Sequence, residues 1–103
     1  MMVAVAVRQI KPDSYDDFRV AWHHDPWLPK YEKALVMRNE DSPDQVLTMA
    51  FFAGTQEEYD AARDDPATMR AEEARLHRIA EFEERVLLSG VFELVDEVLP
   101  PEN

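Results

Sequence analysis

The chain has no cysteine and only two glycines among its 103 residues. Without thiols it can form no disulfide framework, no cysteine nucleophile and no thiolate metal site, and the lack of cysteine favours a cytoplasmic location. It also lacks any run of about 18 apolar residues, so the sequence predicts no transmembrane helix. The apolar start of the chain has no preceding basic region, and we interpret it as a strand rather than a signal peptide.

Basic residues are scarce: 11 lysines and arginines stand against 22 acids, for a net charge of −11. This charge repels phosphate backbones and anionic lipid, so we expect neither a nucleic-acid nor a membrane partner. The acids are spread along predicted helices with arginines between them, which is typical of a solvated face rather than a metal cage. We therefore expect no metal site. The hydrophobic content of 46% suffices for a core, and the length predicts one domain over 1–103.

The segment Gln45–Asp65 (QVLTMAFFAGTQEEYDAARDD) carries the clearest structural pattern. Its first part, Val46–Ala53, has no charge and a single hydroxyl, and alternation would place apolar side chains on both faces. Such a strand is expected to be covered on both sides. Gly54 ends the strand, and Thr55 with Glu58 forms a predicted capping box that opens a helix.

The other elements follow from periodicity and turn signals. We expect strands at Val3–Ile10, Lys33–Glu40 and Val91–Leu99, a helix from Asp13 or Ser14 to about His24, a short helix at Thr55–Arg63, and a second helical segment from Asp65-Pro66 to Ser89-Gly90. The order is β-α-β-β-α-β, which predicts an α+β, ferredoxin-like fold with a four-stranded antiparallel sheet. Its first and third strands should be central, and these are the two with almost no charge.

The helices of this arrangement can cover only one face of the sheet, although the central strands are apolar on both faces. The sequence therefore predicts a homodimer in which a second copy packs sheet to sheet. The alternative is a monomer that exposes a large apolar patch.

The element order, the length and the segment Phe51–Arg63 (FFAGTQEEYDAAR) resemble the dimeric α/β-barrel superfamily, above all its antibiotic-biosynthesis-monooxygenase-like branch. The resemblance covers almost the whole chain. It implies a homodimer whose two sheets form a barrel, with a pocket between helices and sheet in each subunit. Members include cofactor-independent oxygenases of polycyclic phenols, haem-degrading oxygenases, isomerases, decarboxylating lyases and proteins of no known activity. The fold alone therefore does not fix the reaction.

Haem-degrading members use an asparagine in the first strand, with a tryptophan and a ligating histidine in the later helical region. This chain has no asparagine in its first strand and no tryptophan after Trp27, and His77 lies further along the helix than that ligand. The resemblance thus disfavours haem, and we expect no cofactor.

Three histidines are the candidate catalytic groups, because imidazole can exchange protons near neutrality. His23 and His24 lie in the cluster Trp22–Trp27 (WHHDPW), and His77 lies on the long predicted helix. Neighbouring helical residues point about 100° apart, so His23 and His24 cannot both face one pocket. Alternatively, the pair only stabilises a helix end through the dipole, and His77 is a boundary residue.

The candidate substrate-binding residues are mostly aromatic, as a planar ligand requires. They are Trp22, Trp27, Tyr31, Phe18 and Arg38, the last as a partner for an anionic group. The alternatives are a core role for Trp22, loop anchoring or dimer contacts for Trp27 and Tyr31, and a surface salt bridge for Arg38. Arg8 is expected to be a partly buried cation, with an acid of the partner chain as one possible counter-ion.

Two functions remain open from the sequence. The first is a monooxygenase-like enzyme that binds a planar phenolic substrate between helices and sheet. The second is a non-catalytic dimeric binding or assembly protein whose pocket is filled by its own side chains. A cavity of a few hundred Å³ or more lined by a histidine would favour the first.

Overall fold

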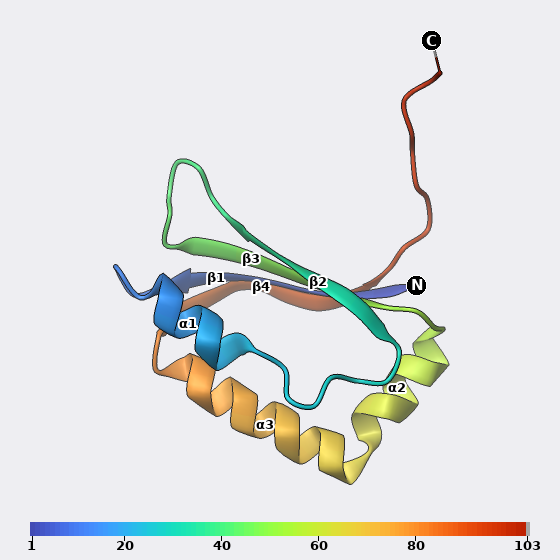
Figure 1. The fold of residues 1–103 in the computed structure, drawn as a ribbon, viewed down its shortest axis with the longest axis horizontal. Coiled ribbons are helices and arrows are strands. Elements are labelled where there is room, and N and C mark those ends of the chain that lie inside the picture. Colours follow the sequence, from blue (N-terminus) through green and yellow to red (C-terminus); the bar gives the residue numbers. More distant parts are fainter. Residues whose placement is uncertain (103) are drawn as a thin grey trace.

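The computed structural model describes residues 1–102, which form an antiparallel sheet with all helices on one face (Figure 1). The elements are β1 (Met2–Ile10), α1 (Tyr15–Trp22), β2 (Tyr31–Arg38), β3 (Gln45–Phe52), α2 (Gln56–Asp64), α3 (Pro66–Ala80) and β4 (Glu83–Glu93). The α+β, ferredoxin-like prediction is confirmed, with the second helical segment divided from the first at Asp65.

The strand order is β2-β3-β1-β4, so the first and third strands are central as predicted. In the register of β1 with β3, Ala4 lies opposite Ala50 and Ala6 opposite Thr48. Residues that alternate along these strands share a face, so these side chains all point toward the helices. We call this side of the sheet the cavity face and the opposite side the outer face.

The helix boundaries follow the predicted caps at α2 and α3. The Glu58 N–H donates to the Thr55 hydroxyl and the Thr55 N–H donates to the Glu58 carboxylate, which confirms the capping box. Asp65 accepts from the Thr68 N–H, and Pro66 occupies the first turn of α3. The Ser14 hydroxyl at the start of α1 instead donates to the Lys11 carbonyl.

The prediction for the C-terminal third was wrong in its boundaries. The helix ends at Ala80 rather than at Ser89-Gly90, and the last strand is Glu83–Glu93 rather than Val91–Leu99. The free edge of β1 decides this, because pairing residues 83–93 with it satisfies backbone groups that would otherwise be unpaired. Two register shifts in this pairing show that the segment adapts to β1 despite its helix-like spacing of apolar residues.

Two smaller boundaries also differ. The strand β2 begins at Tyr31, opposite Phe52, and ends at Arg38 rather than at Glu40. The helix α1 ends at Trp22, because His23 has an extended ψ of 132°. This early end places His24 outside the helix, which matters for the site.

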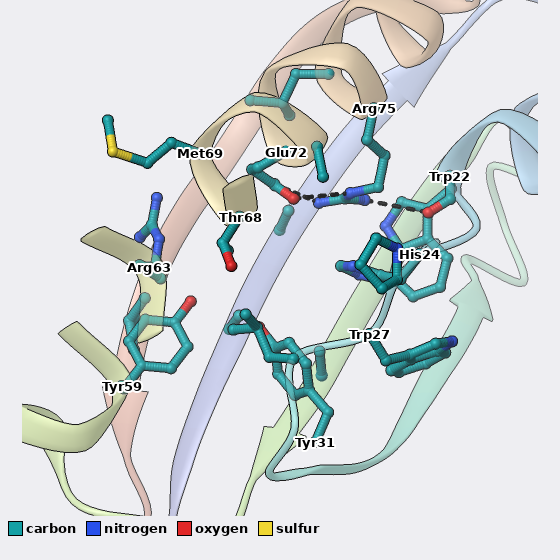
Figure 2. A pocket seen from close by; sticks show the side chains of 18 of the residues that line it. Trp22, His24, Trp27, Tyr31, Tyr59, Arg63, Thr68, Met69, Glu72 and Arg75 are labelled. Carbon is teal, nitrogen blue, oxygen red and sulfur yellow. Dashed lines mark hydrogen bonds and ion pairs between the residues drawn. The ribbon is translucent and has the colours of Figure 1, made fainter. Parts of the chain in front are cut away.

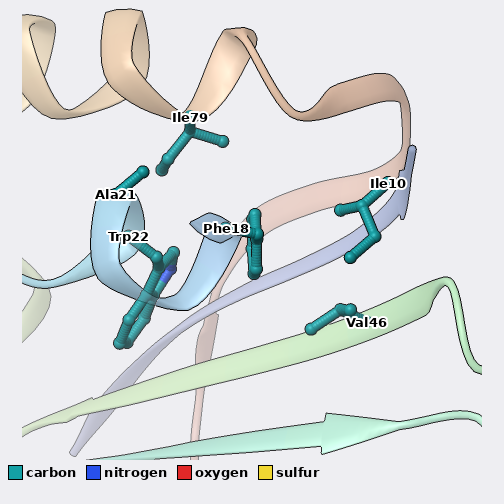
Figure 3. Packing of buried hydrophobic residues seen from close by; sticks show 6 residues of the cluster. All are labelled: Ile10, Phe18, Ala21, Trp22, Val46 and Ile79. Atoms are coloured by element: carbon teal, nitrogen blue, oxygen red, sulfur yellow. The ribbon is translucent and has the colours of Figure 1, made fainter. Parts of the chain in front are cut away.

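The main core lies between α1, α3 and the end of the sheet nearest their contact (Figure 3). It consists of Ile10, Phe18, Ala21, Trp22, Val46 and Ile79. The helical spacing of Met69 and Leu76 predicts that both lie on the apolar face of this helix, but they are 56% and 46% exposed. Only the C-terminal end of α3 therefore packs into the core against α1. The N-terminal half of α3 lies over a part of the sheet that the core does not fill.

The outer face of the sheet is apolar and is not covered by any element of residues 1–102 (Figure 1). Its half-exposed or exposed side chains include Val5, Val7, Leu47, Met49, Phe51, Leu35 and Met37. The prediction that both faces are covered therefore holds within one chain only for the cavity face. Among the described residues, no helix is both long and apolar enough to cross a membrane.

Candidate functional site

A cavity of about 870 Å³ lies between the cavity face of the sheet and the helices (Figure 2). Small side chains form its floor: Ala4 and Ala6 of β1, Ala50 of β3 and Ser89 of β4, which lies opposite Ala6. The alternation of valine and alanine in β1 accounts for this, because the alanines face the helices and the valines face outward. Larger side chains at these positions would fill the space, so the sequence of β1 itself creates the cavity.

Four aromatic side chains form one wall of the cavity: Trp22, His24, Trp27 and Tyr31 (Figure 2). The His24 ring is central, at 5.0 Å from the Trp22 centroid, 5.0 Å from Trp27 and 5.7 Å from Tyr31. His24 is only 9% exposed, whereas Trp27 is 37% exposed at the mouth. Such a wall offers flat apolar surfaces to a planar ligand, with one titratable ring among them.

The wall continues toward α2 through edge-to-face contacts. Tyr31 meets Phe52 at 5.9 Å, and Phe52 meets Tyr59 at 5.2 Å. Tyr59 of α2 is buried and lines the cavity, and the Arg63 guanidinium lies 5.6 Å from its ring centroid. The capped start of α2 therefore serves the site by holding Tyr59 against the sheet.

The opposite wall comes from α3 and carries a fixed ion pair. Glu72 accepts from both Nε and Nη2 of Arg75, at 3.0 and 2.6 Å. Arg75 Nη1 also donates to the Trp22 carbonyl, at 3.2 Å, and so joins α3 to the end of α1 (Figure 2). Burial raises the pKa of Glu72, but the hydrogen bonds and charge of Arg75 outweigh it, so its net pKa is below the usual value.

His24 is a neutral imidazole at neutral pH. Burial among aromatic rings lowers the pKa of His24 to about 4, with the nearby positive charge of Arg75 as the second cause. Burial also raises the pKa of Tyr31, and the Tyr59 hydroxyl raises it further. The wall therefore offers a proton acceptor in His24 beside the phenol of Tyr31, which stays protonated.

Arg8 is a second buried cation of the cavity, projecting from the central strand β1 and only 6% exposed. Its Nε donates to Glu83 of the same chain at 2.9 Å, so its counter-ion is supplied by its own chain. Burial lowers the pKa of Arg8 and Arg75 lowers it further, against the attraction of Glu83. Its guanidinium nevertheless remains charged.

The predicted site residues separate into two groups. The structure brings Trp22, His24, Trp27 and Tyr31 together around the cavity. His23 and His77 are exposed and do not line it, Phe18 is fully buried in the core, and Arg38 lies 4.6 Å from the Tyr15 ring with its Nε bonded to the Pro43 carbonyl. Of the adjacent pair, His24 lines the pocket and His23 does not, and both lie beyond the end of α1, so the helical spacing assumed from the sequence does not apply to them.

Glu72, Arg75 and Thr48 line the cavity but were not singled out from the sequence. The two α3 residues looked like part of a solvated charged face, since acids and arginines alternate along that helix. Glu72 and Arg75 are three residues apart, a spacing that suits an ion pair on one face of a helix and that could have indicated them from the sequence. Thr48 could also have been indicated, because it is the one hydroxyl in the otherwise apolar segment Val46–Ala53.

Within residues 1–102, no group of three or more histidine, cysteine or acidic side chains is placed to hold a metal ion.

No protein-family model matches the sequence, and no curated protein matches it significantly. Solved structures share its fold. SnoaB, a cofactor-independent oxygenase from Streptomyces nogalater, is 12% identical with a TM-score of 0.67, over 97% of each chain. A "putative antibiotic biosynthesis monooxygenase" from Nitrosomonas europaea is 14% identical with a TM-score of 0.65, over 93% of this chain and 100% of that one. Rv0793 from Mycobacterium tuberculosis is 13% identical with a TM-score of 0.62, over 95% and 98%. These likenesses confirm the expected resemblance at the level of the fold.

Proposed function

We propose that the protein is a cofactor-independent oxygenase that binds a planar phenolic substrate in the cavity between sheet and helices. The observation that carries the proposal is the neutral, buried His24 held between Trp22, Trp27 and Tyr31 on the wall of that cavity. The fold shared with SnoaB, a cofactor-independent oxygenase, is consistent with this reaction class.

The reaction converts a phenol into a quinone with dioxygen as co-reactant. The phenol gives up its hydroxyl proton, and the ring carbon opposite the hydroxyl gives up its hydrogen. One oxygen atom enters the ring at that carbon, and the other leaves as water with the two hydrogens. Four electrons pass from the substrate to dioxygen, so the balance requires no further reductant.

Each group of the wall has a role in this scheme. The rings of Trp22 and Trp27 hold the aromatic substrate, and the neutral His24 accepts the phenolic proton. A base with a pKa of about 4 accepts this proton only if the phenolate is stabilised nearby, and the buried guanidinium of Arg75 supplies the positive charge. His23, His77, Phe18 and Arg38 lie outside the cavity and have no part in the scheme.

The outer face of the sheet supports a second part of the proposal, a homodimer formed sheet to sheet. Leu35 and Met37 are 41% and 42% exposed, and they adjoin the half-exposed apolar side chains of β3. A second copy of the same face would remove this surface from water, which is the main source of stability in such interfaces.

A binding protein with a filled pocket is the alternative. Phe18 belongs to the core and Met69 is 56% exposed, so neither occupies the space between sheet and helices. The open volume of about 870 Å³ favours a protein that takes a ligand.

Dioxygen uptake with two- and three-ring phenols, such as 1-naphthol and 1,8-dihydroxyanthrone, tests the enzymatic proposal. We expect uptake and formation of a quinone with the wild-type chain, and a loss of at least about 100-fold in His24→Gln. His77→Gln, on the exposed side of α3, is the matched control and should keep full activity. Uptake that is absent in the wild type, or unchanged in His24→Gln, would contradict this role.

A further inference from the structure

The Arg8 guanidinium is only partly satisfied. Its Nε is paired with Glu83, but Nη1 is buried and has no hydrogen-bond partner among residues 1–102. A buried donor without a partner destabilises the fold, and more so when the group is charged. The backbone at Arg8 cannot shift to relieve this, because β1 is a central strand that is paired on both sides. A ligand that brings an acceptor to this guanidinium would recover that free energy.

The surroundings of Arg8 leave room for such an acceptor. Ala6 is the next residue of β1 on the same face, and Thr48 lies diagonally across on β3 with its side chain also on that face. Because Nη1 is closed to solvent, we expect the guanidinium to turn toward an incoming acceptor.

The positive charges of the cavity lie in its interior, and the negative charges lie nearer its mouth. The two arginines that are buried, Arg8 and Arg75, lie close enough for each charge to affect the other. Their counter-ions are more accessible, since the Glu83 side chain is 22% and the Glu72 side chain 33% exposed. The remaining acids of the lining, Asp25, Asp65 and Glu73, are exposed at the mouth. The interior thus favours a negative group although the whole chain is strongly acidic.

We infer that the ligand of this cavity is an aromatic carboxylate, whose carboxylate is bound at the floor by Arg8. This inference rests on the proposed function and adds the class of substrate, a phenol that carries an acid group. A carboxylate, with its single negative charge, suits the site better than a phosphate, because Arg8 and Arg75 each already have one counter-ion.

Calorimetric titration with a matched pair of probes tests this inference. The pair is 3-hydroxy-2-naphthoate and its methyl ester, which share the ring and the phenol and differ in charge. We expect the wild-type chain to bind the acid at least about tenfold more tightly than the ester, as for a hydrogen bond between charged groups.

Arg8→Met combined with Glu83→Gln removes the cation together with its counter-ion, so that no buried charge is left unpaired and the fold is kept. We expect this double variant to bind the acid and the ester equally, with ester binding as in the wild type. Arg78→Met, on the exposed side of α3, is the control and should keep the preference.

The outcomes separate the two proposals. Equal binding of acid and ester by the wild type, or a preference that survives in the double variant, would overturn the inference while leaving the phenol-binding cavity intact. Failure of the wild type to bind either probe would overturn both.

Discussion

At the scale of single residues, His24 is the titratable group at the centre of the aromatic wall of the cavity. The end of α1 at Trp22 releases the chain from the helix, so that His23 stays exposed while His24 turns in against Trp22 and Trp27. The sequence placed the histidine pair at the pocket but could not say which member enters it. That choice depends on the backbone at His23, which tertiary packing sets.

The low pKa of His24 predicts how stability depends on pH. The folded chain binds the imidazole proton only near pH 4, whereas the unfolded chain binds it near the ordinary value of 6.5. Stability is therefore full above about pH 6.5 and is lost as the pH falls toward 4. Between about pH 7 and about pH 5 we expect the free energy of unfolding to drop by about 2 kcal/mol through this group.

Urea denaturation at the two pH values measures this drop, and His24→Gln should remove it. His77→Gln serves as the comparison, because that side chain is exposed on α3. An equal pH dependence in wild type and His24→Gln would show that His24 is not a buried neutral group.

At the scale of elements, the sequence predicted the central strands and the helix starts, because their signals are local. The caps at Thr55 and Asp65, and the strands β1 and β3 with almost no charge, are recognised from neighbouring residues only. The last strand was misplaced because its spacing, with Val86 and Leu87 adjacent, also fits a helix. Pairing with β1, a contact between the two ends of the chain, decided the outcome.

The apolar outer face of β2 and β3 predicts self-association through the sheet. We expect sedimentation to show a dimer at micromolar concentration, and Met49→Glu in the centre of this face to give a folded monomer, since burying the new charge in an interface is costly. Val20→Glu places the same charge on α1, where Val20 is 77% exposed, and should remain a dimer. A monomeric wild type would contradict the prediction.

At the scale of the whole molecule, the cavity belongs to no single element. Its floor comes from β1, β3 and β4, its aromatic wall from the end of α1 and the loop before β2, and its charged wall from α3. The residues of the aromatic wall are close together in the chain, so the sequence predicts them as a group. The floor cannot be predicted in the same way, because an alanine in a strand lines a cavity only when the helices above it leave the space open.

The most direct test of the central claim, that this cavity binds a planar phenol, is a titration of 1-naphthol followed by tryptophan fluorescence. We expect saturable quenching in the wild type, since Trp22 and Trp27 line the cavity, and at least about tenfold weaker binding in Ala6→Leu, whose side chain would fill the floor. Ala61→Leu makes the same change on the exposed side of α2 and should bind as the wild type. Binding that is unaffected by Ala6→Leu would place the ligand elsewhere and contradict the account.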